Sequence, residues 1–332
     1  MEYRKLGKTG FEVSAVSLGT WQVGGRWGDP FNDATAEAII HQAIDQGVNF
    51  IDTADVYSME NGRGLSEAAV GRVVKSRTET VRVATKCGRQ LNPHVNQAYT
   101  PASLRGFVEA SLRNTGLDTL DLIQLHCPPT EVYYRPEIFE TFDRLKDEGK
   151  IRNLGVSVQT VEEALKAIEF DNVTTVQIIF NMFRHRPSER FFEQAAKRDV
   201  GIIVRVPLAS GLLSGKYTAQ TQFGAEDHRT FNREGAAFDK GETFSGVDYA
   251  TGLAAVAALK ALFGDEIALA QWALRWILMF PQVSCVIPGA SRVEQLTSNL
   301  EAGAVRALTE AEMQGVQAIY AQYIKPTVHA LW

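Results

Sequence analysis

The chain has 332 residues, of which 45% are hydrophobic and 22% are charged, and its formal net charge is −5 at pH 7. This balance is typical of a folded globular protein, and the lack of a basic block or stripe argues against a nucleic-acid partner. The first residues lack the apolar run of a signal peptide, and the most apolar segment, residues 267–280, is too short to cross a bilayer. We therefore expect a cytoplasmic protein with no membrane partner.

The three cysteines, Cys87, Cys127 and Cys285, are an odd and sparse set. Such a set argues against a disulfide framework and fits a reducing compartment. Cys87 and Cys127 directly follow Lys86 and His126. Buried packing at strand ends is the favoured interpretation of both, and a catalytic thiol is the alternative.

Taken in chain order, the sequence begins with a predicted β-hairpin in which residues 3–6 and 12–14 flank a Lys8-Thr9-Gly10 turn. A first buried strand follows at residues 15–18, and apolar strands then alternate with amphipathic helices. The further predicted strands are residues 49–53, 81–85, 121–125, 151–157, 174–179, 201–206 and 283–287. The predicted helices are residues 33–46, 66–75, 100–115, 136–148, 161–169, 188–198, 267–280, 292–301 and 310–323.

Helix boundaries carry recognisable signals. The predicted caps at helix starts are Ser66, Thr100, Thr160, Ser188 and Thr309, and the predicted stops are Gly47, Gly116 and Gly149. A long stretch at residues 208–245 has no predicted element, and such loops are usually functional or disordered.

The alternation of eight strands with eight helices, with no break in composition, predicts an α/β fold. We expect a (β/α)8 TIM barrel with an N-terminal β-hairpin and extra C-terminal helices, forming a single domain over residues 1–332. A doubly wound open sheet is the alternative, but the sequence has no Gly-x-Gly-x-x-Gly after the first strand.

Polar residues stand where three of the predicted strands end. Asp52, Lys86 and His126 each terminate an apolar run, and Tyr57 follows in the loop after Asp52. Because active sites of barrels lie at the carboxyl ends of the strands, we expect these four side chains in one pocket.

The four residue types suit proton donation to an oxygen. A phenol with a pKa near 10 is a weak acid at neutral pH, and a nearby Lys ammonium favours the phenolate and lowers that pKa. Asp52 would hold Lys86 charged and oriented, while His126 would donate a hydrogen bond to a carbonyl oxygen. A structural ion pair, a strand-end histidine and a packed loop tyrosine are the alternatives for each residue alone. No nucleophile or metal-ligand spacing is evident, and we expect no metal.

Ordered motifs over essentially the whole chain resemble the aldo-keto reductase family, in the bacterial branch that also includes the potassium-channel β subunits. They are Tyr3-Arg4-Lys5-Leu6-Gly7 with Gly10, Leu18-Gly19-Thr20-Trp21, Asp52-Thr53-Ala54-Asp55-Val56-Tyr57, Ala84-Thr85-Lys86, Leu125-His126, Gly149-Lys150-Ile151-Arg152, Leu154-Gly155-Val156-Ser157, Gln177, Asn181, Pro207-Leu208, Gly211-Leu212-Leu213-Ser214-Gly215-Lys216-Tyr217 and Val286-Ile287-Pro288-Gly289-Ala290.

The resemblance implies an oxidoreductase that reduces aldehydes or ketones with NADPH, NADH being less favoured. Tyr57 would be the general acid, Lys86 and Asp52 would tune it, and His126 would orient the carbonyl. The implied cofactor contacts are Gly19, Thr20, Trp21, Asp52, Ser157, Gln177, Arg205, Pro207, Leu208, Ala209, Ser210, Gly211, Ser214, Lys216, Gly289, Ser291, Arg292, Gln295 and Asn299.

Three positions differ from the residues that are common in the family. Arg292 at a helix start suits a 2′-phosphate, but Ser291 replaces a common Lys or Arg, so the NADPH preference is expected to be moderate. Val158 replaces an Asn that follows Ser157 in many members. Arg205 stands where an aromatic residue usually stacks on the nicotinamide, and a guanidinium can stack in its place.

Other functional expectations concern the substrate and the loop. Trp21, Trp27, Tyr57 and Phe31 form a predicted apolar substrate wall, with a core position or loop packing as the alternative for Trp27. Residues 208–245 would close over the cofactor. An NADPH-binding redox-sensing regulatory subunit is a competing function, and a barrel lyase or isomerase is a third. The expected partner is a small-molecule carbonyl substrate, and the sequence specifies neither its identity nor an oligomeric state.

Overall fold

The centre of the molecule is a sheet of eight parallel strands in the computed structural model, which describes residues 1–25 and 29–332. The strands are β3 (Leu18–Gly19), β4 (Phe50–Asp52), β7 (Arg82–Cys87), β8 (Leu122–His126), β9 (Leu154–Ser157), β10 (Val173–Ile179), β11 (Gly201–Arg205) and β12 (Val283–Val286). Neighbours in the sheet follow chain order. Parallel bridges from Val16 to Val286 and from Gly19 to Gly289 join the first strand to the last. The sheet therefore closes into the predicted barrel.

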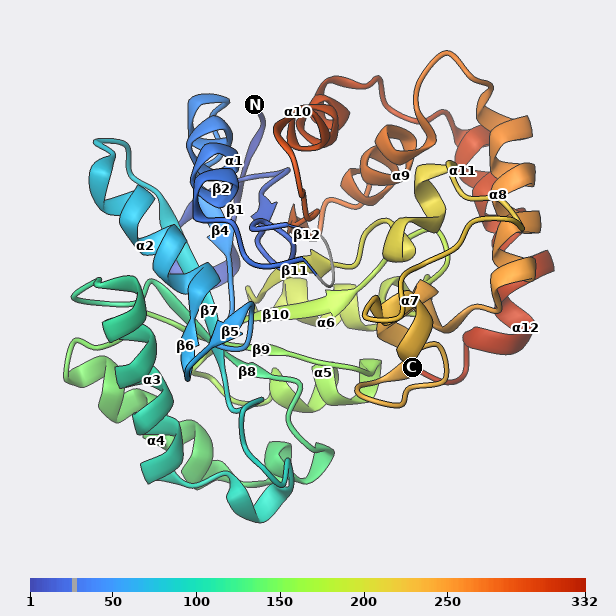
Figure 1. Cartoon of the computed structure of the whole chain (residues 1–332). Coiled ribbons are helices and arrows are strands. Elements are labelled where there is room, and N and C mark those ends of the chain that lie inside the picture. Colours follow the sequence, from blue (N-terminus) through green and yellow to red (C-terminus); the bar gives the residue numbers. More distant parts are fainter. Residues whose placement is uncertain (26–28) are drawn as a thin grey trace.

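In the described part of the chain, helices follow each strand and surround the barrel (Figure 1). The surrounding helices are α1 (Asp33–Asp45), α2 (Leu65–Ser76), α3 (Pro101–Thr115), α4 (Pro136–Asp147), α5 (Val161–Ala167), α6 (Phe191–Lys197), α9 (Leu269–Leu278) and α10 (Val293–Glu301). The additional ones are α7 (His228–Phe231), α8 (Tyr249–Phe263), α11 (Glu310–Ile319) and α12 (Lys325–Val328). Figure 1 shows α8, α11 and α12 together on one side of the molecule. No helix in the described ranges is both long and apolar enough to span a bilayer.

An N-terminal hairpin closes the amino-terminal end of the barrel, which we call the lower end; the carboxyl end is the upper end. Its strands β1 (Tyr3–Lys5) and β2 (Glu12–Ser14) pair antiparallel, as predicted. Leu6 and Val13 of this segment pack in one apolar cluster with barrel residues such as Phe50. A second, larger cluster fills the layer between the strands and the helices. The amino-terminal end of the barrel is therefore apolar, which leaves the carboxyl end for chemistry. A further short hairpin, β5 (Met59–Glu60) with β6 (Arg63–Gly64), lies beyond that end.

Several predicted helix starts are confirmed by cap geometry. Thr100, Thr160 and Thr309 each accept a hydrogen bond from the third helical residue in a capping box. Gly116 ends α3 with a φ of 65°, a conformation that glycine adopts without a Cβ penalty.

Other local predictions are wrong. Ser66 and Ser188 do not cap their helices, because α2 and α6 begin after Gly64 and Arg190 and neither has a side-chain cap. The strand of Lys86 extends to Cys87, so this lysine lies inside β7. Helix α8 was not predicted at all; its run of Ala and Leu gives it no clear apolar stripe, although Asp248 caps it through Thr251 N.

Candidate active site

The four predicted catalytic residues meet at the carboxyl end of the barrel. Asp52 ends β4, His126 ends β8 and Lys86 is the last residue but one of β7, while Tyr57 lies in the turn after β4. Asp52, Tyr57 and His126 line a pocket of about 390 Å³, and Lys86 lies fully buried behind them. Parallel pairing of β4, β7 and β8 produces this arrangement, because it brings the ends of the three strands side by side.

The Lys86 ammonium is the centre of the group. Its Nζ donates to Asp52 Oδ2 at 2.5 Å, to the Thr53 carbonyl at 2.8 Å and to Tyr57 Oη at 3.2 Å. Burial alone lowers the pKa of Lys86, but Asp52 and Tyr57 outweigh burial, so this pKa lies above its usual value. Lys86 is therefore a buried cation that touches the phenol.

Tyr57 keeps its proton over the physiological range. Burial raises the pKa of its hydroxyl above the usual value, and the Lys86 ammonium offsets only part of that rise. The predicted lowering by the Lys86 ammonium is present, but burial outweighs it, because ionising a buried phenol costs more free energy than the neighbouring cation returns. The phenol is thus a proton donor that releases its proton only to a strongly basic oxygen.

His126 is neutral beside Tyr57. Burial lowers the pKa of the imidazole well below its usual value, and the nearby cations Lys86 and Arg89 add to this shift. The ring meets the Tyr57 ring edge to face, with centroids 6.1 Å apart. Its Nδ1 is buried without a hydrogen-bond partner among the described residues. A neutral imidazole at this position offers one ring N–H to a ligand.

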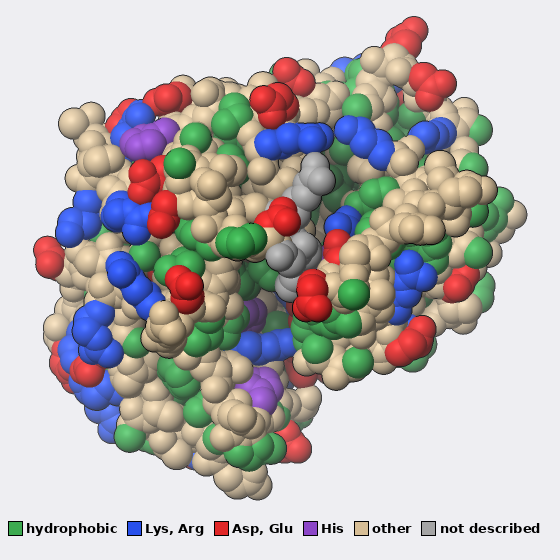
Figure 2. All heavy atoms as spheres, in the orientation of Figure 1, with side chains coloured by type: hydrophobic (Ala, Val, Ile, Leu, Met, Phe, Trp, Pro, Cys, Tyr) green, Lys and Arg blue, Asp and Glu red, His purple; other side chains and the backbone are tan. Residues whose placement is uncertain are grey.

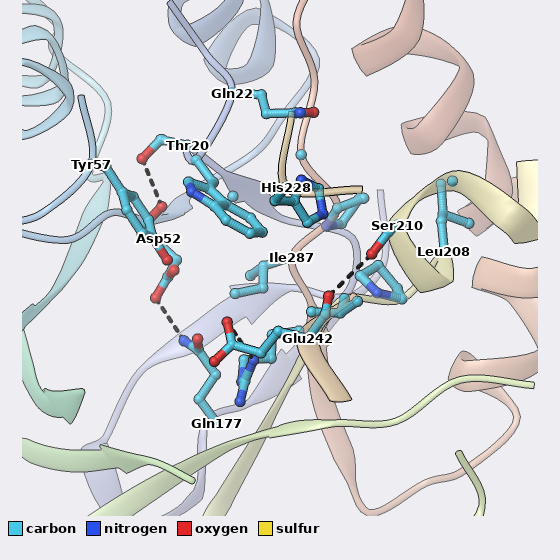
Figure 3. Close-up of a pocket in the computed structure, with 18 of the residues that line it drawn as sticks. Thr20, Gln22, Asp52, Tyr57, Gln177, Leu208, Ser210, His228, Glu242 and Ile287 are labelled. Carbon is cyan, nitrogen blue, oxygen red and sulfur yellow. Dashed lines mark hydrogen bonds and ion pairs between the residues drawn. The ribbon is translucent and has the colours of Figure 1, made fainter. Parts of the chain in front are cut away.

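Two glutamines hold the other oxygen of Asp52. Gln177 Nε2 donates to Asp52 Oδ1 at 2.7 Å and Gln124 Nε2 donates to it at 3.0 Å. Gln177 Nε2 also donates to Gln124 Oε1 at 3.2 Å, so both of its N–H groups are engaged. Figure 3 shows Gln177 directed at Asp52 on the pocket floor. The carbonyl oxygen of Gln177 is the group that remains for a ligand amide.

The predicted cofactor residues divide into two groups. Those that line the pocket are Gly19, Thr20, Trp21, Asp52, Gln177, Arg205, Pro207, Leu208, Ser210, Gly211, Gly289 and Gln295. The others, which are not in the lining, are Ser157, Ala209, Ser214, Lys216, Ser291, Arg292 and Asn299. Ser157 and Ala209 are buried, whereas Lys216 and Arg292 are exposed and have no ion-pair partner among the described residues.

Arg205 is buried in the pocket wall. Its Nη2 donates to the Val158 carbonyl and to Gln159 Oε1, each at 3.0 Å, and its Nη1 lies 3.6 Å from Glu242 Oε2. Val158, the residue that replaces the expected Asn, therefore contributes its carbonyl to holding this guanidinium. Arg205 is held in place before any ligand arrives.

The backbone is strained beside two of the site residues. Cys127 and Val206, which directly follow His126 and Arg205, have φ values of 47° and 51°. Positive φ is rare for non-glycine residues and is an outlier for a β-branched one. Such conformations cost about 1–3 kcal/mol each and are typical of functional sites.

The pocket has a second wall, whose individual residues the sequence did not predict. Tyr217, His228, Arg229, Phe238 and Glu242 reach it from the segment between β11 and α8. This segment contains η5 (Ala209–Ser214), α7, η6 (Lys240–Glu242) and η7 (Phe244–Gly246). The other unpredicted lining residues are Gln22, Val56, Arg89, Val206, Ile287 and Pro288. The segment is the one expected to close over the cofactor, and its length and its content of Gly, Thr and charge were the signals; closure over a cofactor stays a prediction.

Of the four residues predicted to form an apolar substrate wall, Trp21 and Tyr57 line the pocket. The Trp21 ring lies 6.3 Å from Tyr57, 5.1 Å from His228 and 6.2 Å from Phe238, measured between centroids. Phe31 is not among the described lining residues and packs against Gly24. Trp27 lies outside the described residues.

The structure is a closed parallel barrel. A buried Lys–Asp pair, a phenol and an imidazole lie at its carboxyl mouth, so the protein is a (β/α)8 barrel with its site at the strand ends. The chain belongs to the Aldo/keto reductase family, whose sequence model matches residues 15–321, and is an oxidoreductase of that family.

Individual relatives agree with this assignment. Aldo-keto reductase YhdN of Bacillus subtilis (strain 168) is 32% identical over 303 residues, which cover 89% of this chain and 87% of that protein. A probable voltage-gated potassium channel subunit beta of Arabidopsis thaliana is 28% identical over 319 residues, 91% of each protein. The solved glycerol dehydrogenase AKR11B4 of Gluconobacter oxydans matches with a TM-score of 0.77 and 29% identity over 99% of this chain and 98% of that one. The predicted family, its branch and the barrel fold are confirmed.

Proposed function

We propose that this protein reduces aldehydes or ketones to alcohols with NADPH. The observation that carries the proposal is the Lys86 ammonium, bound to both the Asp52 carboxylate and the Tyr57 hydroxyl beside a neutral His126. Tyr57 and His126 line the same pocket, so one carbonyl oxygen can meet both.

Each residue has a role in moving one proton. Bound NADPH would supply a hydride to the carbonyl carbon. Tyr57 Oη gives its proton to the carbonyl oxygen, which completes the alcohol. Lys86 Nζ, 3.2 Å from Tyr57 Oη, stabilises the phenolate that remains. The His126 ring N–H donates to the carbonyl oxygen and orients it, an interaction that strengthens as negative charge develops there.

The lining residues fit an extended dinucleotide. The lining includes Asp52 and Gln177 together with Pro207, Gly289 and Gln295. At Gly289, a Cβ would meet only one atom within 4 Å, so the backbone there is open to a ligand. We infer that Arg205 lies against the nicotinamide face and that the Gln177 carbonyl accepts from the carboxamide.

The preference for NADPH rests on charge at the outer end of the site. Arg292 is the N-cap residue of α10 and has no ion pair among the described residues. A helix N-terminus and a free guanidinium together favour a 2′-phosphate. Ser291 adds no charge, so a moderate preference over NADH is expected. A cytoplasmic location and a single domain over residues 1–332 stay predictions.

One relative supports a reaction that interconverts an alcohol and a carbonyl compound. The glycerol dehydrogenase from Gluconobacter oxydans acts, by its name, on an alcohol, which is the product side of carbonyl reduction. The similarity to a potassium channel subunit beta favours a second candidate, an NADPH-binding regulatory subunit with slow turnover. Turnover of a carbonyl substrate distinguishes the two.

The proposal is tested by titrating the protein with NADPH and with NADH, following nucleotide fluorescence, and then adding a panel of aldehydes. We expect tighter binding of NADPH and its oxidation when an aldehyde is added. Binding without oxidation would favour the regulatory subunit. If neither nucleotide bound, the proposed function would be wrong.

A further inference from the structure

Arg89 is a pocket residue that the proposed hydride and proton transfers do not use. It lies three residues after Lys86, in the loop that leaves β7, and it lines the same pocket as Tyr57 and His126. Its side chain is 21% exposed. The described residues offer its guanidinium one ionic neighbour, Glu242 Oε1, at 3.9 Å, which is too long for a hydrogen bond. Among the described residues, the Arg89 guanidinium therefore has this long ion pair and no side-chain hydrogen bond, which leaves its N–H donors available to a ligand.

The other charges of the pocket lining are already paired. Asp52 binds Lys86, and Arg229 binds Asp227 through Nε and Nη2. Glu242 accepts from Gln159 Nε2 at 2.8 Å and lies 3.6 Å from Arg205. Glu242 is also the ion-pair partner of Arg89, at 3.9 Å, so two guanidiniums share one carboxylate and the described lining keeps one surplus positive charge; Arg89 is the arginine of this pair that makes no hydrogen bond to the described residues.

The surplus charge lies close to the reacting groups. Figure 2 shows basic and histidine side chains together in the hollow of the molecular surface. Arg89 is one of the cations that depress the pKa of His126, after burial and Lys86. Trp21 and Phe238 supply an apolar wall in the same pocket. The pocket thus combines a carbonyl site, an aromatic surface and one surplus positive charge.

We propose that Arg89 binds the carboxylate of the substrate, so that the preferred substrates are aldehydes or ketones that carry a carboxylate beyond an apolar body. This inference rests on the proposed function. A guanidinium matches a carboxylate with two parallel hydrogen bonds. One surplus charge suits a monoanion, whereas a phosphate dianion would bring its second charge next to Glu242. Arg89 is a specificity residue, since proton transfer remains with Tyr57.

The test compares two aldehydes that differ in charge, 4-formylbenzoate and methyl 4-formylbenzoate. We expect wild-type protein to show a higher kcat/KM for the acid. In Arg89→Met, the acid-to-ester ratio of kcat/KM should fall about 10- to 100-fold, mostly through KM, because a charge-assisted pair is lost. Arg89→Lys should recover part of the ratio. Arg198→Met, an exposed arginine at the far end of the barrel, controls for net charge and should leave the ratio unchanged.

Two outcomes would overturn the assignment of Arg89. One is an acid-to-ester ratio that Arg89→Met does not change. The other is a matching loss of NADPH affinity in that variant, which would place Arg89 at the nucleotide. If wild-type protein reduces neither aldehyde, the proposed function has failed, and calorimetric binding of 4-(hydroxymethyl)benzoate and its methyl ester to wild type and Arg89→Met still decides whether Arg89 binds the carboxylate.

Discussion

On strand β4, Phe50 and Asp52 project from the same face, yet they lie in opposite environments. Phe50 packs in the apolar cluster at the hairpin end of the barrel, and Asp52 lines the pocket at the other end. Two other barrel strands repeat this change: Ala84 precedes Lys86 on β7, and Ile203 precedes Arg205 on β11, each by two residues. Side chains two apart on a strand share a face, so a single step along the barrel interior separates core from site.

The two ends of the barrel are stabilised by different interactions. The lower end depends on burial of apolar area, which tolerates substitutions of similar volume. The upper end holds a buried ion pair, unpaired polar atoms and strained backbone, which cost free energy unless they serve a ligand. Substitutions at the two ends should therefore separate stability from activity.

The largest effect is expected from Tyr57→Phe. The variant keeps the ring and loses the proton donor, so kcat for aldehyde reduction should fall about 10²- to 10⁴-fold. Lys86 retains Asp52 and the Thr53 carbonyl as acceptors, so stability should change little. Steady-state kinetics and urea unfolding measure the two quantities. Retained turnover would show that another group donates the proton.

Lys86→Met should damage both activity and stability. Removing one partner of a buried ion pair leaves Asp52 charged and uncompensated, at a cost of about 3–5 kcal/mol. The double variant Lys86→Met with Asp52→Asn is the control, and it should recover part of the lost stability without recovering turnover. Equal stability of the single and double variants would contradict the ion-pair account.

Phe50→Ala tests the other end of the same strand. A Phe to Ala change in a buried core costs about 3–5 kcal/mol. At a temperature where the variant remains folded, its kcat should stay within a few-fold of the wild type, because no ligand meets the lower end. Chemical denaturation with parallel kinetics measures both. A loss of kcat as large as that of Tyr57→Phe would mean that the two ends are not separable.

Asp55→Asn should change how stability depends on pH. Burial first, and then Glu67, raise the pKa of Asp55 to about 8. Between about pH 4 and pH 8 the folded protein keeps a proton that the unfolded chain has released, so stability falls as pH rises.

The Asn variant should lack that fall. Urea unfolding at pH 4, 6 and 8 should show the two proteins diverging, with the variant gaining about 4–5 kcal/mol relative to the wild type between pH 4 and pH 8. Parallel stability curves would show that Asp55 titrates normally in the folded protein.

The smallest effect is expected at Ser210. Its hydroxyl donates to the Glu242 carbonyl at 3.1 Å and accepts from Phe244 N at 3.0 Å, and Figure 3 shows the contact between Ser210 and Glu242. Ser210→Ala should lower the free energy of local opening of the segment between β11 and α8 by about 0.5–1.5 kcal/mol. Limited proteolysis between residues 216 and 247 should then be faster. Ser214→Ala, which loses a bond to Gly211 in its own turn, is the control. Equal proteolysis of both variants would contradict a role for the Ser210 contacts.

Local chemistry made much of the fold predictable. Thr100 and Thr160 cap their helices because their hydroxyls reach backbone donors within the next three residues. The alternating pattern predicted the barrel, and the polar residues at strand ends predicted Asp52, Lys86 and His126. Helix α8 was missed because its sequence is apolar on nearly every side, and only the elements packed against it select the face that is buried.

The sequence by itself determined the strands, most helix starts and the group of Lys86 with Asp52, Tyr57 and His126, because each depends on neighbours in the chain or on the common end of parallel strands. Only the tertiary structure decided which residues complete the pocket. Glu242 lies within 4 Å of Arg205 and of Arg89, and the three residues come from segments far apart in the chain. No spacing along the sequence encodes such a contact. The pKa of Tyr57 was decided in the same way, because burial is a property of the folded molecule.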